Sequence, residues 1–429
     1  MKPLFARRPL RVDPEPAIII YYARFVSRGG TNTLNSGNFK RKDVCGMIKH
    51  RRKTGLSALL ALSMGFSLLP AAPVMAAGPT ETAAIFMAAG ESAGGKGAQE
   101  AALPERFDLR DEKLVSSPKA QDPWGSCWGF AATAAAEISI LAEIRDYAER
   151  NGYTEMAEIF SDPDALDLSE LQLAWFAATP YPEGDPDGQA GEGVKVTGTH
   201  PLNVSGSLAL AASIYSSAVG PVSEETIPYR PKEWEDENAR NYIGNGAWIY
   251  SQRDPDDPNS YADWSVDEEY RSSYLFELED AYVLPAPAQP SEDYDRVRAE
   301  MATREIKEQL LDKRGVAVTF LADDFLPGQA KEGETPLYLN PETWAHYIWR
   351  PTDKDGNEVP DLVRANHAVC VVGWDDSYSV DNFLSDHRPP APGAWICKNS
   401  WGALGENVPP NRNNWGVNGT GYFYLSYYD

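Results

Sequence analysis

The stretch QDPWGSCWGFAATAAAEISILAEIRDYAER spans residues 121–150. From Cys127 onward it is rich in alanine, and Ile138, Leu141 and Ile144 recur at helical spacing. This pattern predicts a helix that starts near Cys127. A thiol at a helix N-terminus faces the positive end of the helix dipole, so we expect a lowered thiol pKa and a reactive Cys127. A buried, inert cysteine is the alternative that this stretch alone leaves open.

The remaining pattern places helices early in the chain and strands late. That order predicts an α+β protein with a helical part and a sheet part. Ser169 is the expected N-cap of one helix, because serine often accepts a hydrogen bond from the first turn. We expect further helices over residues 168–178, 207–218 and 300–315, and strands over 316–321, 367–374, 394–401 and 421–428.

Composition restricts the class of protein. The chain has 429 residues, of which 42% are hydrophobic, so it can form a sizeable core. Its formal net charge is -24, although residues 1–77 hold 13 Lys and Arg against 3 Asp and Glu. The rest of the chain is therefore strongly acidic, which argues against nucleic acid or an anionic membrane as a partner. A soluble extracellular surface explains this acidity without any special function.

A secretory signal peptide is predicted to begin at Met47. A basic stretch over residues 49–53 precedes an apolar run from about Leu56 to Leu69, and small residues follow up to Ala77. This is the three-part layout of a signal peptide, and a retained membrane anchor is the alternative. We therefore expect a secreted or cell-surface protein.

The positions of these segments suggest how the N-terminal region is organised. Signal peptides begin at the N-terminus, so residues 1–46 are interpreted as a doubtful extension before the true start. The signal peptide covers 47–77, and residues 78–102, rich in Ala, Gly and Glu, are interpreted as a flexible linker.

Three cysteines remain after this region: Cys127, Cys370 and Cys397. An odd number of cysteines in an exported protein indicates a free, reactive thiol.

Three motifs resemble, in the same order, those of the papain family of cysteine peptidases, including its bacterial secreted members. Gln121 lies six residues before Cys127, in a segment similar to the nucleophile segment of that family. His367 begins HAVCVVGW, which resembles the strand that carries the catalytic histidine. Asn399 lies in KNSWG, which resembles the family's Asn-Ser-Trp-Gly segment. The resemblance implies a papain-like fold of two subdomains, one helical and one a β-sheet or barrel, with the active site in the cleft between them.

The resemblance also implies roles for these residues. Cys127 would be the nucleophile, His367 the acid and base, and Asn399 the residue that orients the imidazole. Gln121 and the backbone N–H of Cys127 would form the oxyanion hole.

Three further residues are expected to contact substrate. Trp401 would shield the histidine–asparagine hydrogen bond. Gly206 lies where the family has a glycine pair that binds substrate backbone, and Gly125 adjoins the nucleophile segment. Such a site acts on polypeptide substrates and needs no metal and no organic cofactor.

The resemblance covers residues 103–429, the expected peptidase domain. It divides into a helical part over about 103–231, an insertion over about 232–295 and a sheet part over about 296–429. His367 and Asn399 lie farther from the nucleophile than the roughly 130–150 residues usual in the family, and the insertions at 232–295 and 375–393 account for much of the difference.

The disulfide cysteines of the family are missing, and Trp124 stands where one of them is usual. Cys370 lies three residues from His367, whereas Cys397 lies two residues from Asn399. Alternate residues of a strand face opposite sides, so we expect these two thiols to face apart and to form no disulfide.

The sequence therefore predicts a secreted papain-like cysteine endopeptidase that acts through a thioester acyl-enzyme. The alternative is a catalytically silent papain-like binding module at the cell surface, which would not need all four of the expected catalytic residues. His200, His346 and His387 lie in loop-like sequence and are expected to be solvated or locally hydrogen-bonded. Asp375, Asp376 and Asp381 could bind Ca2+, but exposed acidic loops are usually only solvated.

Overall fold

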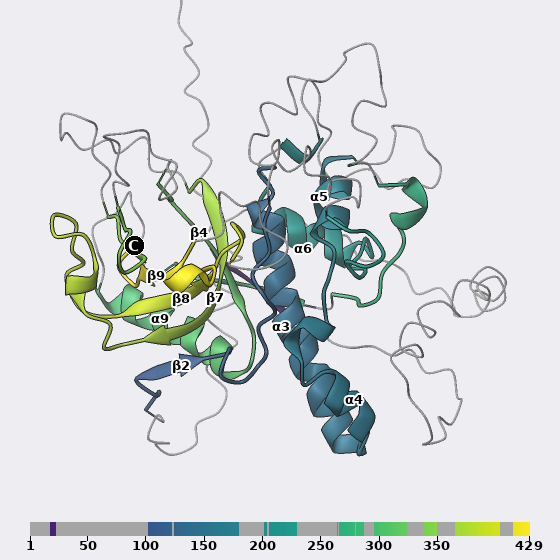
Figure 1. Cartoon of the computed structure of the whole chain (residues 1–429), viewed down its shortest axis with the longest axis horizontal. Coiled ribbons are helices and arrows are strands. Elements are labelled where there is room, and N and C mark those ends of the chain that lie inside the picture. Colours follow the sequence, from purple (N-terminus) through teal and green to yellow (C-terminus); the bar gives the residue numbers. More distant parts are fainter. Residues whose placement is uncertain are drawn as a thin grey trace, which may run out of the picture. The chain divides into compact units, whose positions relative to one another are not determined.

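A computed structural model describes twelve stretches of the chain and shows an α+β protein, which confirms the predicted fold class (Figure 1). The elements below belong to one compact unit, formed by Met1–Asn38 and Glu105–Asp429. The predicted signal peptide and the linker up to residue 101 lie outside the described residues. The described residues are 18–22, 102–121, 124–179, 201–203, 206–229, 264, 266–278, 280–286, 296–323, 338–349, 365–403 and 415–429.

The longest helix is α3, which runs from Cys127 to Asn151 and so begins at the predicted nucleophile. It ends at Gly152, whose left-handed conformation (φ 69°) lets its N–H bond back to the helix. Serine caps begin two other helices, as expected for Ser169, because the Ser169 and Ser207 hydroxyls accept bonds from Gln172 N and Leu210 N. The other helices are α4 (Thr154–Ile159), α5 (Glu170–Ala178), α6 (Leu208–Ser216) and α9 (Arg296–Leu311), with 3-10 turns at Pro163–Ala165, Pro201–Asn203, Glu268–Tyr270, Val380–Asn382 and Val417–Gly419.

The described strands form one open, mixed sheet. Of the two forms expected for the second subdomain, a sheet or a barrel, these strands therefore show the sheet. The order along it is β3-β1-β4-β7-β8-β9-β6-β5, and β2 also pairs with β7. Only β6 and β9 are parallel among these pairs. The strands are β1 (Ile18–Tyr22), β2 (Arg106–Asp108), β3 (Asp280–Leu284), β4 (Val316–Phe320), β5 (Leu339–Asn340), β6 (Ala345–His346), β7 (His367–Asp375), β8 (Ala394–Lys398) and β9 (Tyr422–Ser426).

Several strands had no clear signal in the sequence. Strand β1 lies within residues 1–46, where no strand periodicity is apparent, and β3 lies within the predicted insertion. Strands β5 and β6 have two residues each, too few for an alternating pattern to show.

The register of β7 and β8 decides which side chains share a face of the sheet. Cys370 pairs with Lys398, and Val371 pairs with Cys397. Directly paired residues point to the same face and successive residues to opposite faces, so the two thiols face apart as expected. All three described cysteines are free.

Helix α3 packs closely against the sheet. In Figure 1 it stands between the strands and helices α5 and α6, and the three contribute to one continuous hydrophobic core with β4, β7 and β8. A Cβ atom at Gly315, just before β4, would lie 2.7 Å from Ile138 Cδ1 and 3.1 Å from Ala135 Cα. Glycine at this position therefore permits the short distance between helix and sheet.

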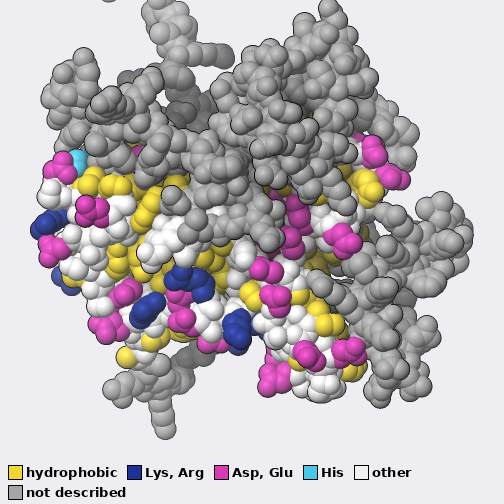
Figure 2. Space-filling model, in the orientation of Figure 1, with side chains coloured by type: hydrophobic (Ala, Val, Ile, Leu, Met, Phe, Trp, Pro, Cys, Tyr) yellow, Lys and Arg dark blue, Asp and Glu magenta, His cyan; other side chains and the backbone are white. Residues whose placement is uncertain are grey.

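The surface agrees with the acidic composition. On the face drawn in Figure 2, acidic side chains are spread over the described surface with fewer Lys and Arg among them. Among the described residues, α3 alone is long and apolar enough to cross a membrane, and 83% of its apolar window is buried inside the protein. The buried core helix of a globular domain meets the same criterion.

We predict that Gly315→Ala lowers the free energy of unfolding by about 1–3 kcal/mol, because the added methyl group overlaps Ala135 Cα and Ile138 Cδ1. Urea unfolding followed by circular dichroism measures this change. The matched control is Gly129→Ala in α3, whose Cβ would meet nothing nearer than Leu173 Cδ2 at 3.8 Å. The control should be neutral or stabilising, because alanine favours helix. Equal stability of the two variants would show that the contact at Gly315 is not tight.

Candidate active site

Cys127 is the first residue of α3, and its side chain is partly buried. The backbone N–H groups of Cys127, Trp128 and Ala368 lie around its sulfur and favour the thiolate. Ala368 belongs to β7 and follows His367 directly, so the helix and the strand bring the thiol to the start of β7. The preceding residue does not cap the helix with its side chain, since the Ser126 hydroxyl is bonded to the Tyr229 hydroxyl at 2.6 Å.

His367 is the first residue of β7 and is 5% exposed. Its Nε2 atom lies 2.7 Å from Asn399 Oδ1. The Ser400 backbone N–H donates to the same oxygen at 2.8 Å, which identifies that atom as the carbonyl oxygen of the amide. His367 Nε2 must therefore be the protonated nitrogen, and Nδ1 is left to accept a proton. The Trp401 ring stacks on the imidazole, with centroids 4.2 Å apart and planes 24° apart.

Burial acts against the charged form of both groups. It raises the pKa of the Cys127 thiol, although the three N–H groups around the sulfur act in the opposite direction. It also lowers the pKa of His367 to about 4, while the hydrogen bond to Asn399 acts to raise it. The helix dipole led us to expect a lowered thiol pKa. The structure shows the opposite direction, because the desolvation of Cys127 outweighs the favourable backbone groups.

Gln121 is buried and its side-chain amide has a fixed orientation. Its Oε1 atom accepts the Ser400 hydroxyl at 2.8 Å, and its Nε2 donates to Trp124 O at 2.9 Å. The donor end of the amide is therefore turned toward the loop that leads to Cys127. The Gln121 backbone N–H also donates to Ser400 O at 2.8 Å, so the segment before Cys127 is paired with the segment after Asn399.

Of the three residues expected to contact substrate, only Trp401 directly contacts one of the candidate catalytic residues in the described part of the structure. A Cβ at Gly206 would lie 2.1 Å from the Trp128 ring, so Gly206 adjoins the residue after Cys127. Gly125 lies in the loop before α3, and a Cβ there would meet nothing within 4 Å. Trp401 touches His367, as described above.

Sequence reasoning missed Trp415. Its ring lies 5.3 Å from Trp401 edge-on and 5.0 Å from Trp344, so it supports the ring that covers the imidazole. Residues 404–414 separate the two tryptophans in sequence and lie outside the described residues. The tryptophan-rich composition of this region was the available signal.

His346 differs from the expectation of a solvated or locally bonded side chain. It is 2% exposed in β6, and its Nδ1 lies 2.9 Å from Asp429 Oδ2. The Phe320 ring packs edge-on against both His346 and His367, and His346 contributes to the lowered pKa of His367. His387 lies 3.3 Å from Asp386, and His200 lies outside the described residues.

Among the described residues, no group of three or more His, Cys, Asp and Glu side chains is arranged to hold a metal ion. Two of the three aspartates weighed for Ca2+ have protein cations as partners. Asp376 bonds to Lys307, and Asp381 lies 2.8 Å from Arg388. Asp375 accepts bonds from the backbone and hydroxyl of Ser377.

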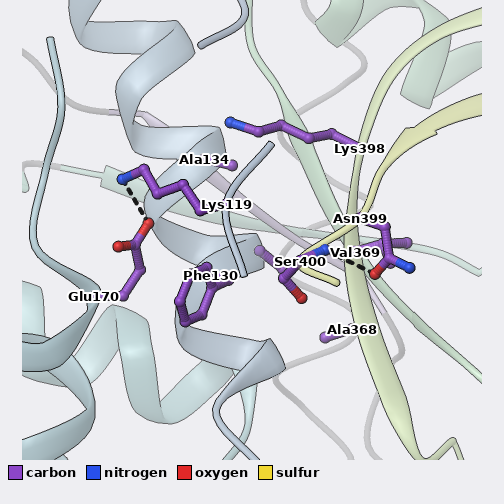
Figure 3. Close-up of a pocket in the computed structure, with 10 residues that line it drawn as sticks. Lys119, Phe130, Ala134, Glu170, Ala368, Val369, Lys398, Asn399 and Ser400 are labelled. Atoms are coloured by element: carbon purple, nitrogen blue, oxygen red, sulfur yellow. Dashed lines mark hydrogen bonds and ion pairs between the residues drawn. The ribbon is translucent and has the colours of Figure 1, made fainter. Parts of the chain in front are cut away.

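A cluster of charged side chains, most of them buried, lies beside Asn399 and Ser400, and Figure 3 labels its members Lys119, Glu170 and Lys398. We call it the ion cluster; it contains Lys119, Glu137, Asp167, Glu170 and Lys398. Members of it share the walls of one small cavity with Asn399 and Ser400. Burial raises the pKa of Glu170 from 4.5 to about 8, although Lys119 acts to lower it.

We predict opposite changes in the pKa of His367 on removing its two neighbours. Trp401→Ala admits water, reduces the desolvation of the imidazolium and raises the pKa from about 4 toward the ordinary 6.5. Asn399→Ala removes a hydrogen bond that favours the imidazolium and lowers the pKa further. NMR titration of the imidazole in a Cys127→Ala background measures both changes. A shift in the same direction in the two variants would contradict this interpretation.

We predict that Glu170 makes folding less favourable as pH rises. Its folded pKa exceeds its ordinary value, so the folded state binds the extra proton between about 4.5 and 8, and stability is lost as pH rises through that range. The contribution is at most about 1.4 kcal/mol per pH unit. Urea unfolding of the wild type and Glu170→Gln at pH 6.5, 7.25 and 8 measures the difference in slope. Parallel slopes would mean that Glu170 keeps an ordinary pKa.

Residues 103–149 match the family Peptidase_C1, papain family cysteine protease. No curated protein sequence matches the chain significantly. A solved structure of the cysteine protease and lectin-like domains of Cwp84, a surface layer associated protein of Clostridium difficile, is 21% identical over 77% of this chain, with a TM-score of 0.41. A digestive procathepsin L2 proteinase from the Tenebrio molitor larval midgut is 20% identical over 76% of this chain and 64% of its own, with a TM-score of 0.36.

The chain spans about half (49%) of the Cwp84 chain that it matches. The family match over 103–149 contains Gln121 and Cys127 and ends before His367 and Asn399. It confirms the resemblance to the papain family of cysteine proteases that the sequence motifs indicated.

Proposed function

We propose that this protein is a secreted papain-like cysteine endopeptidase. One observation carries the proposal: the Cys127 thiol, at the N-terminus of α3, lies against the N–H of Ala368, and the residue before Ala368 is His367, whose imidazole Asn399 holds through Nε2. A nucleophile, a base with its proton-accepting nitrogen left unbonded by Asn399, and an orienting amide are the parts that acyl transfer by a thiol requires.

In the first half of the reaction, His367 Nδ1 takes the proton of the Cys127 thiol, and the thiolate attacks the peptide carbonyl carbon. The carbonyl oxygen becomes an oxyanion, which accepts bonds from the backbone N–H of Cys127 and from the second N–H of Gln121 Nε2. The intermediate then expels the amine, which takes the proton from His367. A thioester between Cys127 and the acyl part of the substrate remains.

In the second half, His367 takes a proton from water, and the hydroxide attacks the thioester carbonyl. Collapse of this intermediate releases the carboxylic acid product, and the thiolate recovers a proton from His367. Trp401 stacks on the imidazole and excludes water from the bond to Asn399, so the ring keeps its orientation through both halves.

Export is proposed on separate grounds. The basic, apolar and small-residue segments over 47–77 favour a signal peptide, and polypeptides outside the cell or at its surface are then the substrates. The proposed reaction uses protein groups throughout, with no nucleic acid and no organic cofactor.

The second candidate function is a papain-like binding module that has the fold but no peptidase activity. The position of Gln121 argues against it. A binding module has no use for a buried glutamine whose carbonyl oxygen is fixed by the Ser400 hydroxyl so that its donor end faces the nucleophile loop.

We predict that an epoxysuccinyl thiol inhibitor labels the protein rapidly near pH 6, with the adduct on Cys127. An ordinary thiol is mostly protonated and slow at that pH, and burial raises the pKa of Cys127 further, so rapid labelling requires that His367 take the proton of the thiol during the reaction. Mass spectrometry of intact protein and peptides measures the rate and the site, and Cys127→Ala should lose both labelling and peptidase activity. Cys370 and Cys397 are fully buried and act as internal controls that stay unlabelled in the folded protein. Slow labelling of the wild type, equal to that of the variant, would instead favour the binding module.

A further inference from the structure

Glu137 lies on the same helix as Cys127, and its two carboxylate oxygens bond in two directions. Oε1 lies 3.1 Å from Lys119 Nζ and also accepts the Leu168 backbone N–H at 2.9 Å. Oε2 accepts the Ser116 hydroxyl at 2.6 Å. The side chain is 2% exposed, and its pKa is lowered, because Lys119 and Lys398 outweigh the effect of burial. Glu137 is therefore a buried carboxylate ion.

The first direction leads to the candidate oxyanion donor. Lys119 lies two residues before Gln121, in a segment that pairs with the segment after Asn399. The Lys119 carbonyl accepts the Gly402 N–H at 3.0 Å, and Ala120 bridges to Trp401. Glu137 holds the Lys119 ammonium against α3 together with Asp167, Glu170 and the Leu168 carbonyl, and this fixes the backbone that carries Gln121.

The second direction leads to the orienting asparagine. Lys398 is the last residue of β8 and directly precedes Asn399. Its Nζ donates to the Ser116 hydroxyl at 2.8 Å and lies 3.8 Å from Glu137 Oε2. Successive residues near the end of a strand point to opposite faces, so Lys398 points toward α3 and Asn399 is presented on the other side, toward His367.

Cys127, Gln121 and Asn399 lie on three separate segments, and Glu137 is linked to each of them. It shares helix α3 with Cys127, it bonds to Lys119 in the segment of Gln121, and the Ser116 hydroxyl links it to Lys398, which precedes Asn399. We propose that Glu137 is a positioning residue that sets the relative placement of the nucleophile, the oxyanion donor and the orienting asparagine. The inference rests on the proposed peptidase function.

Stability alone is a weak explanation for such an arrangement. Taking charges out of water costs free energy, and replacing a buried ion pair with apolar side chains is often neutral or stabilising. A carboxylate that bonds directly to Lys119, and that the Ser116 hydroxyl links to Lys398, instead specifies one geometry. Catalysis is sensitive to that geometry, since a displacement of about 1 Å at a site can cost about 100-fold in rate.

Glu137→Gln tests the proposal with a side chain of the same shape and no charge. We expect kcat to fall about 10-fold or more while KM changes less than about 3-fold, because reacting groups are displaced but the substrate surface is kept. Ser116→Ala is the milder second variant. It keeps every charge and removes only the hydroxyl that joins Lys398 to Glu137, so we expect a smaller loss of kcat of the same kind, which tests the proposal even if Glu137→Gln fails to fold.

The matched control is Lys307→Met in α9, which removes the buried cation that pairs with Asp376 and lies over Trp374, at the end of β7 away from His367. It should lower the melting temperature and leave kcat unchanged per folded molecule. All measurements use the full chain, with kcat and KM for a peptide substrate and epoxysuccinyl titration of active sites.

The outcomes separate this inference from the function on which it rests. A wild-type protein that the inhibitor does not label defeats the proposed peptidase, and the positioning role with it. A reactive wild type together with Glu137→Gln and Ser116→Ala variants that lose only stability, as the Lys307 control does, defeats the positioning role alone. A selective loss of kcat in these variants supports it.

Discussion

The close packing of helix α3 on strand β7 is the contact on which the candidate site depends. The thiol is carried by the helix and the imidazole by the strand, so no local bond fixes their separation. Ala135 on the helix and Gly315, just before the neighbouring strand β4, let the helix approach the sheet, and the first residue of the helix then reaches the N–H of Ala368. The same packing buries His367 and partly buries Cys127.

Local signals in the sequence were sufficient for the elements that carry the site. An alanine-rich run with helical spacing predicted α3, and β-rich segments predicted β4, β7, β8 and β9. Motifs identified Cys127, His367 and Asn399 as candidates, and the structure brings the histidine and the asparagine together directly. Each of these signals lies within a short stretch of chain, where residue type and period are informative.

Contacts between distant segments could not be predicted in this way. Charged and loop-like residues are ordinarily assigned to the surface, yet Glu137 is buried because lysines from two other segments neutralise it. His346 is buried because Asp429, from the end of the described chain, lies beside it. Trp415 was missed because nothing in the sequence indicates that its ring packs against that of Trp401. In each case the burial depends on a side chain from a distant segment of the chain, and a single sequence does not show which distant side chains will meet.

The direction of the pKa shifts explains why geometry matters so much at this site. Burial disfavours the Cys127 thiolate and the His367 imidazolium when each is considered alone. Moving one proton from the thiol to the imidazole creates both charges at once, and opposite charges attract more strongly the closer they lie. That attraction falls as the pair separates, whereas the desolvation cost does not. In the proposed reaction, Cys127 and His367 can form this ion pair only while α3 and β7 keep their relative positions. Glu137, which we propose holds the surrounding segments in place, would therefore affect the chemistry as well as the stability.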